Sequence, residues 1–271
     1  MNYRHGYHAG NFADVVKHLA LVAILQHLKK KDTAFAVVDS HAGRGVYDLT
    51  GEEAAKTGEA RGGLARLINL PDEMPPALAA YLGLVKEGGP SRYPGSPLLA
   101  AQLLRPQDRL TAIEKHPEEF AALKDVLASY ANVQAEQGDG YVRAVKLLPP
   151  PSRRGLVVMD PPFEATDEFE SLARAISGAV RKFATGIFLI WYPVKSQSAT
   201  DAFLGEVLAA GVQKALTVDT QISAPEGKLD RAGLLVINPP YGFDAEMFAA
   251  AQIIAAPLGA DIGVKWRAGG P

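Results

Sequence analysis

Four short strand-like segments of this chain each end in an acidic residue, and this recurrence limits the possible folds more than any other feature. The segments end at Asp39, Glu114, Asp139 and Asp160. Most of them are continuous apolar runs, which are typical of strands buried on both faces of a parallel sheet. Helix-like segments separate them, so the sequence predicts a doubly wound α/β fold. Because such sheets bind ligands at the carboxyl ends of their strands, we expect the four acids to lie at one site.

The same alternation extends along the chain and predicts a mostly parallel sheet of seven strands. Strands are expected at 34–39, 109–114, 133–139, 155–160, 186–192, 213–222 and 232–238. Helices are expected at 12–30, 117–130, 141–147, 167–182 and 199–210. The first helix should be amphipathic, with Asn11 or Asp14 as its N-terminal cap and lysines at its C-terminal end.

Residues 47–95 lie between the first two expected strands, where a simple Rossmann unit has one helix. They contain a helix-like run, 76–86, between breaks rich in glycine and proline, which indicates a small, mostly helical insertion. Ser96 should cap the helix that returns to the sheet, because a proline follows it. The chain is therefore expected to divide into an N-terminal segment with the first helix and strand (1–46), the insertion (47–95) and the remainder of the same domain (96–271).

Composition excludes several classes of protein. The chain is 48% hydrophobic and 21% charged, so it can bury a sizeable core. No stretch approaches the ~18 apolar residues of a membrane-spanning helix, and the N-terminus lacks the apolar run of a signal peptide, so we expect a cytoplasmic protein. The absence of cysteine removes disulfides, iron–sulfur clusters and cysteine nucleophiles. A net charge of −2 does not favour nonspecific binding to nucleic acid, so an enzyme of nucleic acid would recognise it through a pocket.

A turn that contains glycine follows the first expected strand. It reads Asp39-Ser40-His41-Ala42-Gly43-Arg44-Gly45. Glycines at a strand-to-helix turn let the backbone approach a ligand closely. The third glycine of the dinucleotide fingerprint is missing, and no Lys-Ser/Thr pair follows to hold a phosphate. The turn therefore suits a nucleoside better than a pyrophosphate, and a tight turn without a ligand is the alternative.

Two further acids at strand ends could hold parts of a nucleoside. Glu114 can accept hydrogen bonds from both hydroxyls of a ribose, or it can simply precede a helix that starts at Pro117. Asp139, which is followed by Gly140, can accept from the edge of an adenine or form an ordinary Asp-Gly turn. Each alternative stays open for the single residue. Four acids at one edge of a sheet favour a common site.

The sharpest motif is Asp160-Pro161-Pro162-Phe163, directly after a strongly apolar strand. Its two prolines fix the backbone and remove two N–H donors, which leaves carbonyl acceptors. A carboxylate and a neighbouring carbonyl can accept from the exocyclic amino group of a planar base, and an aromatic ring can stack on that base. We therefore expect Asp160 and Pro161 to hold the amino group and Phe163 to hold the base. A plain proline turn is the alternative.

A second motif, Asn238-Pro239-Pro240-Tyr241, has similar chemistry. It follows the seventh expected strand, and only about thirty residues come after it. That length leaves no room for a cofactor-binding glycine turn downstream, so a circularly permuted arrangement is excluded. We interpret Asn238 as structural and Asp160 as catalytic.

The N-terminal segment gathers aromatic and basic side chains: Tyr3, Arg4, His5, Tyr7 and His8. Such a segment favours a lid that stacks on bases and contacts phosphates. A zinc site and a frayed terminus are the alternatives, and the spacing of the histidines offers little support for zinc.

With these motifs in this order, the chain resembles a class I S-adenosylmethionine-dependent amino-methyltransferase. It is similar in particular to the RlmJ family, which methylates N6 of an adenine in 23S ribosomal RNA. The matching motifs are Tyr3-Arg4-His5, His8-Ala9-Gly10-Asn11, Ala13-Asp14-Val15, Lys17-His18, Asp39-x-His41-Ala42-Gly43-x-Gly45, Thr57-Gly58-Glu59, Tyr93-Pro94-Gly95-Ser96-Pro97, Arg153-Arg154-Gly155, Ala184-Thr185-Gly186-Ile187 and Trp191-Tyr192-Pro193.

The resemblance implies a Rossmann-like methyltransferase with S-adenosylmethionine as its cofactor. No metal ion is expected, since the spacing of the histidines gives little support for one. Together with Gly43 of the glycine turn, the residues that would line the cofactor site are His18, His41, Ser96, Glu114, Asp139, Gly140 and Asp160. Asp160 would also be the catalytic acceptor. Tyr3, His5 and Lys17 would face the substrate adenosine, on which Phe163 would stack. The expected partner is 23S ribosomal RNA, free or in an assembly intermediate, and the protein should act as a monomer without membrane contact.

One residue departs from the pattern of the family. The motif of the family usually ends in tyrosine, and Phe163 stands there in this chain. Asp-Pro-Pro-Phe is also similar to the motif of guanine-N2 ribosomal RNA methyltransferases. Guanine-N2 and DNA adenine methylation, and a non-catalytic nucleic-acid-binding protein of the same fold, are therefore the alternatives. A nicotinamide-dependent oxidoreductase shares the fold but has no use for the Asp160 motif.

Overall fold

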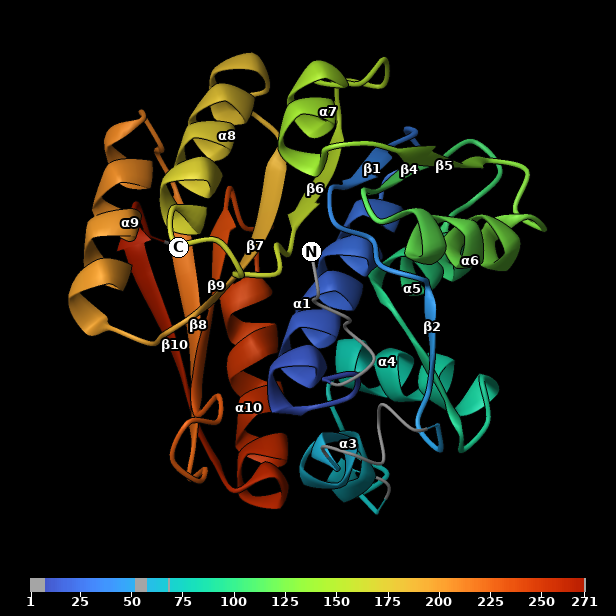
Figure 1. Cartoon of the computed structure of the whole chain (residues 1–271), viewed down its shortest axis with the longest axis vertical. Helices are drawn as coiled ribbons and strands as arrows, with labels where there is room; N and C mark the ends of the chain where they lie inside the picture. The colour runs from blue at the N-terminus through green and yellow to red at the C-terminus, as the bar shows by residue number, and fades with distance from the viewer. Residues whose placement is uncertain (1–7, 52–57, 68, 271) are drawn as a thin grey trace.

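The computed structural model describes residues 8–51, 58–67 and 69–270, and a single sheet forms its centre (Figure 1). The strands of this sheet are β1 (Ala36–Asp39), β4 (Arg109–Glu114), β5 (Val133–Gln137), β6 (Gly155–Met159), β7 (Ile187–Pro193), β8 (Ala215–Ile222), β9 (Arg231–Ile237) and β10 (Ala260–Ala268). Their order is β10-β8-β9-β7-β6-β1-β4-β5. The five strands from β5 to β7 are parallel, and β9, β8 and β10 each pair antiparallel. The predicted α/β class with a mostly parallel sheet is confirmed.

The predicted number of strands was wrong, because the sheet has eight strands and not seven. The seven expected strands are all present, and β10 is the additional one. It pairs antiparallel with β8 at the edge of the sheet, and its residues alternate between half-buried and exposed along most of its length. A search for continuous apolar runs misses a strand of this kind, because only one of its faces packs against the core.

Alternate residues of the strands send their side chains into two separate cores, as the pleat requires. Val37 belongs to one core and its neighbour Val38 to the other. The first core also contains residues of α1 (Phe12–Lys29), α4 (Pro76–Glu87), α5 (Ser96–Leu103), α6 (Pro117–Leu127) and α10 (Phe243–Leu258). The second contains residues of α7 (Gly140–Lys146), α8 (Glu168–Lys182) and α9 (Gln197–Ala209). The molecule is therefore a three-layer structure with the sheet in the middle.

The first helix is buried on nearly all sides and is not amphipathic, contrary to the prediction. Fifteen of its 18 residues are buried, because α4, α5, α10 and the sheet pack around it. Asn11 is its N-cap and accepts a hydrogen bond from the backbone N–H of Asp14 at 2.9 Å. Asn11 is therefore the cap, as one of the two predicted alternatives had it.

The segment between β1 and β4 contains the predicted helix α4 and several shorter elements. These are β2 (Val46–Asp48), α3 (Glu59–Gly62), the 3-10 helix η2 (Leu64–Leu67) and β3 (Arg92–Pro94). An unpredicted two-stranded antiparallel sheet joins β2 to β3. The division of the chain at 46/47 and 95/96 stays a prediction. The prediction that Ser96 caps α5 was wrong, since Gly95 is the N-cap and Ser96 is the first helical residue.

No helix in the described part of the chain has the length and apolar character that a membrane span needs.

Candidate active site

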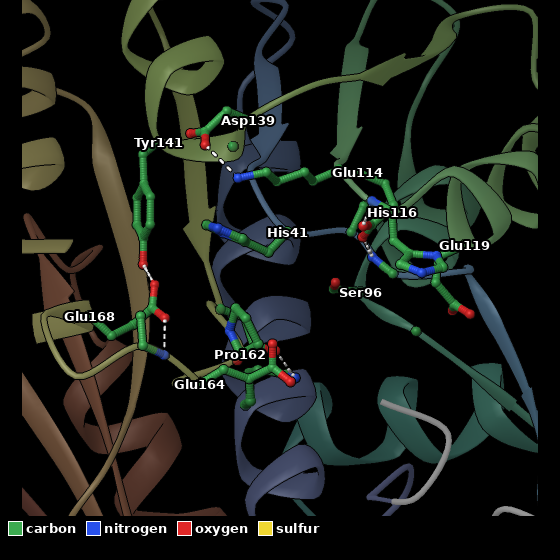
Figure 2. Close-up of a pocket in the computed structure, with 18 of the residues that line it drawn as sticks. His41, Ser96, Glu114, His116, Glu119, Asp139, Tyr141, Pro162, Glu164 and Glu168 are labelled. Carbon is green, nitrogen blue, oxygen red and sulfur yellow. Dashed lines mark hydrogen bonds and ion pairs between the residues drawn. The ribbon is translucent and has the colours of Figure 1, made fainter. Parts of the chain in front are cut away.

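A cavity of about 460 Å³ opens at the carboxyl ends of the central strands. This volume lies in the range of sites for small molecules, ~300–1,000 Å³. The loops after β1, β4, β5 and β6 line it, and the first half of α1 closes its floor (Figure 2). Nine residues that the sequence predicted for the site line the cavity: Lys17, His18, His41, Gly43, Ser96, Glu114, Asp139, Gly140 and Asp160.

Two predicted site residues in the described part of the chain, Pro161 and Phe163, do not line the cavity. Pro161 is buried beside it, and its neighbour Pro162 lines it instead. The ring of Phe163 makes edge contacts with Phe169 and Trp191, at centroid distances of 5.0 and 5.7 Å. Phe163 also has a positive φ of 51°, which is rare for a bulky residue. Tyr3 and His5 lie outside the described residues.

A buried lysine holds the central carboxylate of the site. Nζ of Lys17 donates one hydrogen bond to Oδ1 of Asp14, at 2.7 Å, and another to Oδ2 of Asp160. Burial by itself would lower the pKa of Lys17, but the two carboxylates outweigh it and raise the pKa above the ordinary value. Lys17 is therefore a cation that is fixed between two anions. Oδ1 of Asp160 has no hydrogen-bond partner among the residues that the structure describes.

A second buried carboxylate lies at the end of β1 and lacks a cationic partner in hydrogen-bond contact. Oδ2 of Asp39 accepts a hydrogen bond from Oγ of Ser96 at 2.7 Å. Oδ1 of Asp39 is buried without a partner among the described residues. Burial raises the pKa of Asp39 to about 7, and the nearby Asp160 raises it as well. Asp39 thus holds its proton up to much higher pH than an ordinary aspartate.

The glycine turn is held by Glu114 from the neighbouring strand. Oε2 of Glu114 accepts from the backbone N–H of Gly43 at 2.9 Å, and Oε1 accepts from that of His116 at 2.7 Å. Gly43 and Gly45 have φ values of 62° and 84°, which glycine adopts without strain. The carboxylate keeps lone pairs for further donors, so the predicted contact with a ribose stays a prediction.

The start of α7 forms another wall of the cavity. Asp139 is the N-cap of α7, accepts from the backbone N–H of Val142 at 3.3 Å and pairs with Lys115 at 3.1 Å. A Cβ on Gly140 would lie 1.9 Å from the carbonyl oxygen of Ser40, so only glycine lets α7 approach the turn after β1 this closely. Asp139 thus has a capping role in the chain itself, and its proposed role as an acceptor from adenine stays a prediction.

The sequence interpretation missed several residues that line the cavity: Tyr47, His116, Glu119, Tyr141, Glu164 and Glu168. The hydroxyl of Tyr141 donates to Oε1 of Glu168 at 2.5 Å, and the ring of Tyr141 meets the edge of His41 (Figure 2). Burial lowers the pKa of His41 to about 4, so this ring is neutral at pH 7. Tyr141 follows Gly140 at a predicted strand end and could have been found from that position. Glu168 carries no such signal.

The second proline motif lies at the opposite end of the strands from the cavity. Because β9 runs antiparallel to β7, the end of β9 lies beside the start of β7 and away from the cavity. Nδ2 of Asn238 donates to the carbonyl oxygens of Ala184 and Gly186, at 2.8 and 2.7 Å. These bonds tie two loops together, which agrees with the structural role predicted for Asn238.

The fold and the strand-end cavity define a Rossmann-like class I methyltransferase, and comparison with known proteins specifies the family. The family described as "Ribosomal RNA large subunit methyltransferase D, RlmJ" matches residues 32–268. Two proteins named "Ribosomal RNA large subunit methyltransferase J", from Escherichia coli K12 and Haemophilus influenzae, are each 37% identical to this chain, over 91% of it and 90% of each relative. The chain belongs to the RlmJ family, as its motifs predicted.

A solved structure shares the whole fold. Protein LPL1258 from Legionella pneumophila superposes with a TM-score of 0.87 at 32% sequence identity, and the match covers 95% of this chain and 98% of that chain.

Proposed function

We propose that this protein transfers a methyl group from S-adenosylmethionine to the exocyclic N6 amino group of an adenine in 23S ribosomal RNA. Membership of the RlmJ family supports methylation of ribosomal RNA. The observation that carries the assignment to an amino group is the arrangement of Asp160. Lys17 holds one oxygen of its carboxylate at the cavity, and the other oxygen has no partner among the described residues.

The cavity suits the cofactor of class I methyltransferases. When bound, S-adenosylmethionine supplies an electrophilic methyl group on a sulfonium centre. The positive charges of its sulfonium and ammonium groups fit a cavity in which acidic lining residues outnumber the lysines Lys17 and Lys115. The acidic lining residues are Glu114, Glu119, Asp139, Asp160, Glu164 and Glu168. Nδ1 of His116, on the cavity wall, is buried without a hydrogen-bond partner in the described structure. A polar ligand that enters the cavity would supply such a partner.

Individual residues are assigned to the cofactor by their place in the cavity. Glu114 would accept from the ribose hydroxyls, and Asp139 would lie near the adenine. The remaining wall would be formed by His18, His41, Gly43, Ser96 and Gly140. His41 is neutral at pH 7 and adds no charge against the cationic cofactor.

The target adenine would leave its stack in the RNA and enter beside Asp160, because its amino group is out of reach inside a helix. Asp160 and the carbonyl of Pro161 would accept the two amino hydrogens. These hydrogen bonds localise the lone pair of the amino nitrogen, which is otherwise delocalised into the ring. Asp160 would then accept the proton that the nitrogen loses as it gains the methyl group. Orientation and exclusion of water would supply most of the rate gain.

Two other parts of the chain would bind the substrate. The N-terminal segment, with Tyr3 and His5, would close over the adenosine together with Lys17. Phe163 would stack on the base, and for this its ring has to turn away from Phe169 and Trp191, which it contacts in the present structure. We expect a monomer to act on 23S ribosomal RNA that is free or in an assembly intermediate.

The identity of the modified base is tested by transfer of a radiolabelled methyl group from S-adenosylmethionine to protein-free 23S ribosomal RNA. The RNA is taken from a strain that lacks this gene and is digested to nucleosides after the reaction. We expect the label in N6-methyladenosine. Label in N2-methylguanosine would support the guanine alternative and contradict the proposed base. No label in the RNA despite measurable cofactor binding would contradict the proposed substrate, and a parallel reaction with DNA as the acceptor tests the DNA alternative.

A further inference from the structure

The helical insertion contacts the start of α1 through one carboxylate. Oε2 of Glu59, in the first turn of α3, accepts from Nδ2 of Asn11 at 3.1 Å and lies 2.9 Å from Nδ1 of His8. Although partial burial opposes its ionisation, the hydrogen bonds from His8 and Asn11 bring the pKa of Glu59 below its usual value. Glu59 belongs to one of the motifs shared with the RlmJ family, and the proposed methyl transfer gives it no role.

The backbones of the two segments also touch. The backbone N–H of Leu64 donates to the carbonyl of Gly10 at 2.9 Å. A Cβ on Gly63 would lie 2.1 Å from the same carbonyl oxygen and 2.6 Å from the carbonyl carbon of Asn11. The insertion therefore sets the position of residues 8–11 through both side-chain and backbone contacts, and not through a flexible surface contact.

The contacts continue from Asn11 to the catalytic carboxylate without a gap. Oδ1 of Asn11 accepts from the backbone N–H of Asp14 at 2.9 Å. Oδ2 of Asp14 accepts from the backbone N–H of Gly10 at 3.0 Å, and Oδ1 of Asp14 accepts from Nζ of Lys17 at 2.7 Å. Lys17 in turn donates to Asp160. Each link is a hydrogen bond, so Glu59 and Asp160 are the two ends of one network.

The network matters because of the lysine in its middle. A lysine side chain has four rotatable bonds, and its head is fixed only by the groups that it meets. Oδ1 of Asp14 fixes it, and Oδ2 of the same carboxylate is held by the backbone N–H of Gly10. A shift at the start of α1 would move Asp14 and would withdraw Lys17 from Asp160.

We propose that Glu59 is a positioning residue for methyl transfer: through Asn11 and Asp14 it holds Lys17 against Asp160. This proposal rests on the proposed function, in which Asp160 accepts the proton from the target amino group. It assigns to the insertion an effect on the rate of the chemical step, although Glu59 does not line the cavity.

The first test compares the kcat of Glu59→Ala with that of the wild type. We expect kcat to fall about tenfold, since small displacements of catalytic groups are costly, while the affinity for S-adenosylmethionine, measured by calorimetry, stays unchanged. Glu59→Gln keeps an oxygen that can accept from Asn11 and should retain most of the activity. Glu73→Ala removes an exposed carboxylate from the same insertion and is the control, with wild-type kcat.

A second variant keeps the test decisive if Glu59→Ala does not fold. Asn11→Ser retains a hydroxyl that can cap α1 but lacks the amide N–H that reaches Glu59. It should lower kcat to the same extent as Glu59→Ala. Wild-type kcat in a folded Asn11→Ser or Glu59→Ala protein would overturn the proposal.

A double-mutant cycle separates positioning from a general loss of structure. If Glu59 acts through Lys17, then Glu59→Ala should have no further effect on the single-turnover rate of a Lys17→Met protein. A second tenfold fall in the Lys17→Met background would overturn the proposal. Asp160→Asn is measured in parallel: full activity in that variant would contradict the proposed function itself, whereas an inactive Asp160→Asn with an unaffected Glu59→Ala would contradict only the role of Glu59.

Discussion

Two carboxylates, Asp14 and Asp160, bind the ammonium group of Lys17 at the cavity, and a third, Asp39, lies nearby without a hydrogen bond to it. This difference decides what each carboxylate can do. Asp14 and Asp160 both bind Lys17, and removing one member of such a buried set leaves a charge without compensation, at a cost of about 3–5 kcal/mol. Asp39 has no cation in hydrogen-bond contact: its Oδ2 accepts from the hydroxyl of Ser96, and its Oδ1 is buried without a partner in the described structure. Asp39 is therefore the carboxylate whose ionisation opposes folding.

The substitution Asp39→Asn tests this difference through pH. Burial raises the pKa of Asp39 from 3.8 to about 7, so the folded protein holds a proton that the unfolded chain has lost. The contribution of Asp39 to the free energy of unfolding is therefore fully present below about pH 4 and is lost as the pH rises to about 7. The asparagine side chain has no proton to lose, so the variant should gain stability relative to the wild type over this window, with a constant difference above it. Urea unfolding from pH 4.5 to 8.5 measures the gain in the free energy of unfolding. Because His41 titrates in both proteins, its contribution cancels in the difference between them. A difference independent of pH would contradict the assignment.

Part of this residue-scale picture could be predicted from the sequence. Acids at the ends of strands are visible in the pattern, and Glu114, Asp139 and Asp160 indeed line one cavity. The contact between Lys17 and Asp160 could not be predicted from the pattern, because 143 residues separate the two in the chain. The resemblance placed Lys17 near the substrate, and the structure adds that its ammonium group is fixed by two carboxylates.

At the scale of elements, close backbone contacts shape the site as much as side chains do. The start of α7 approaches the turn after β1 at Gly140, and this contact brings Asp139, Tyr141 and His41 to one wall of the cavity. Strand direction matters equally. The motifs that begin at Asp160 and Asn238 look alike in sequence. However, β6 is parallel and β9 antiparallel to β7, so the two motifs lie at opposite ends of the strands. A local sequence pattern does not reveal the direction of a strand in the sheet, so only the order of the motifs along the chain distinguishes the Asp160 motif from the Asn238 motif.

The substitution Gly140→Ala tests the contact at the start of α7. Its Cβ would lie 1.9 Å from the carbonyl oxygen of Ser40, and backbone has to move to relieve the clash. We expect a loss of about 1–3 kcal/mol in the free energy of unfolding, together with weaker cofactor binding. Gly205→Ala in α9 is the control, because a Cβ there would meet no described atom within 4 Å apart from the adjacent backbone of its own helix. Alanine also stabilises helices by ~1 kcal/mol relative to glycine. Equal stability of the two variants would contradict the close approach.

At the scale of the whole molecule, charge and topology fit an enzyme that admits a base but not the RNA backbone. The net charge is −2 and acids predominate around the cavity. Phosphates would be repelled there, and the proposed entry of a single flipped base avoids this repulsion. The class of fold could be predicted from the alternation of strands and helices. The edge strand β10 and the sheet formed by β2 and β3 could not, because short or one-sided strands have no continuous apolar run.

The proposed function depends above all on Asp160 accepting the proton from the amino group that is methylated. The most direct test is the single-turnover rate of methyl transfer to 23S ribosomal RNA by Asp160→Asn protein, with both substrates saturating. Asparagine has the shape of aspartate but can neither carry its charge nor accept the proton, so the rate should fall about a hundredfold or more, as the loss of a general base requires. A rate in Asp160→Asn that equals that of the wild type would contradict the catalytic role of Asp160.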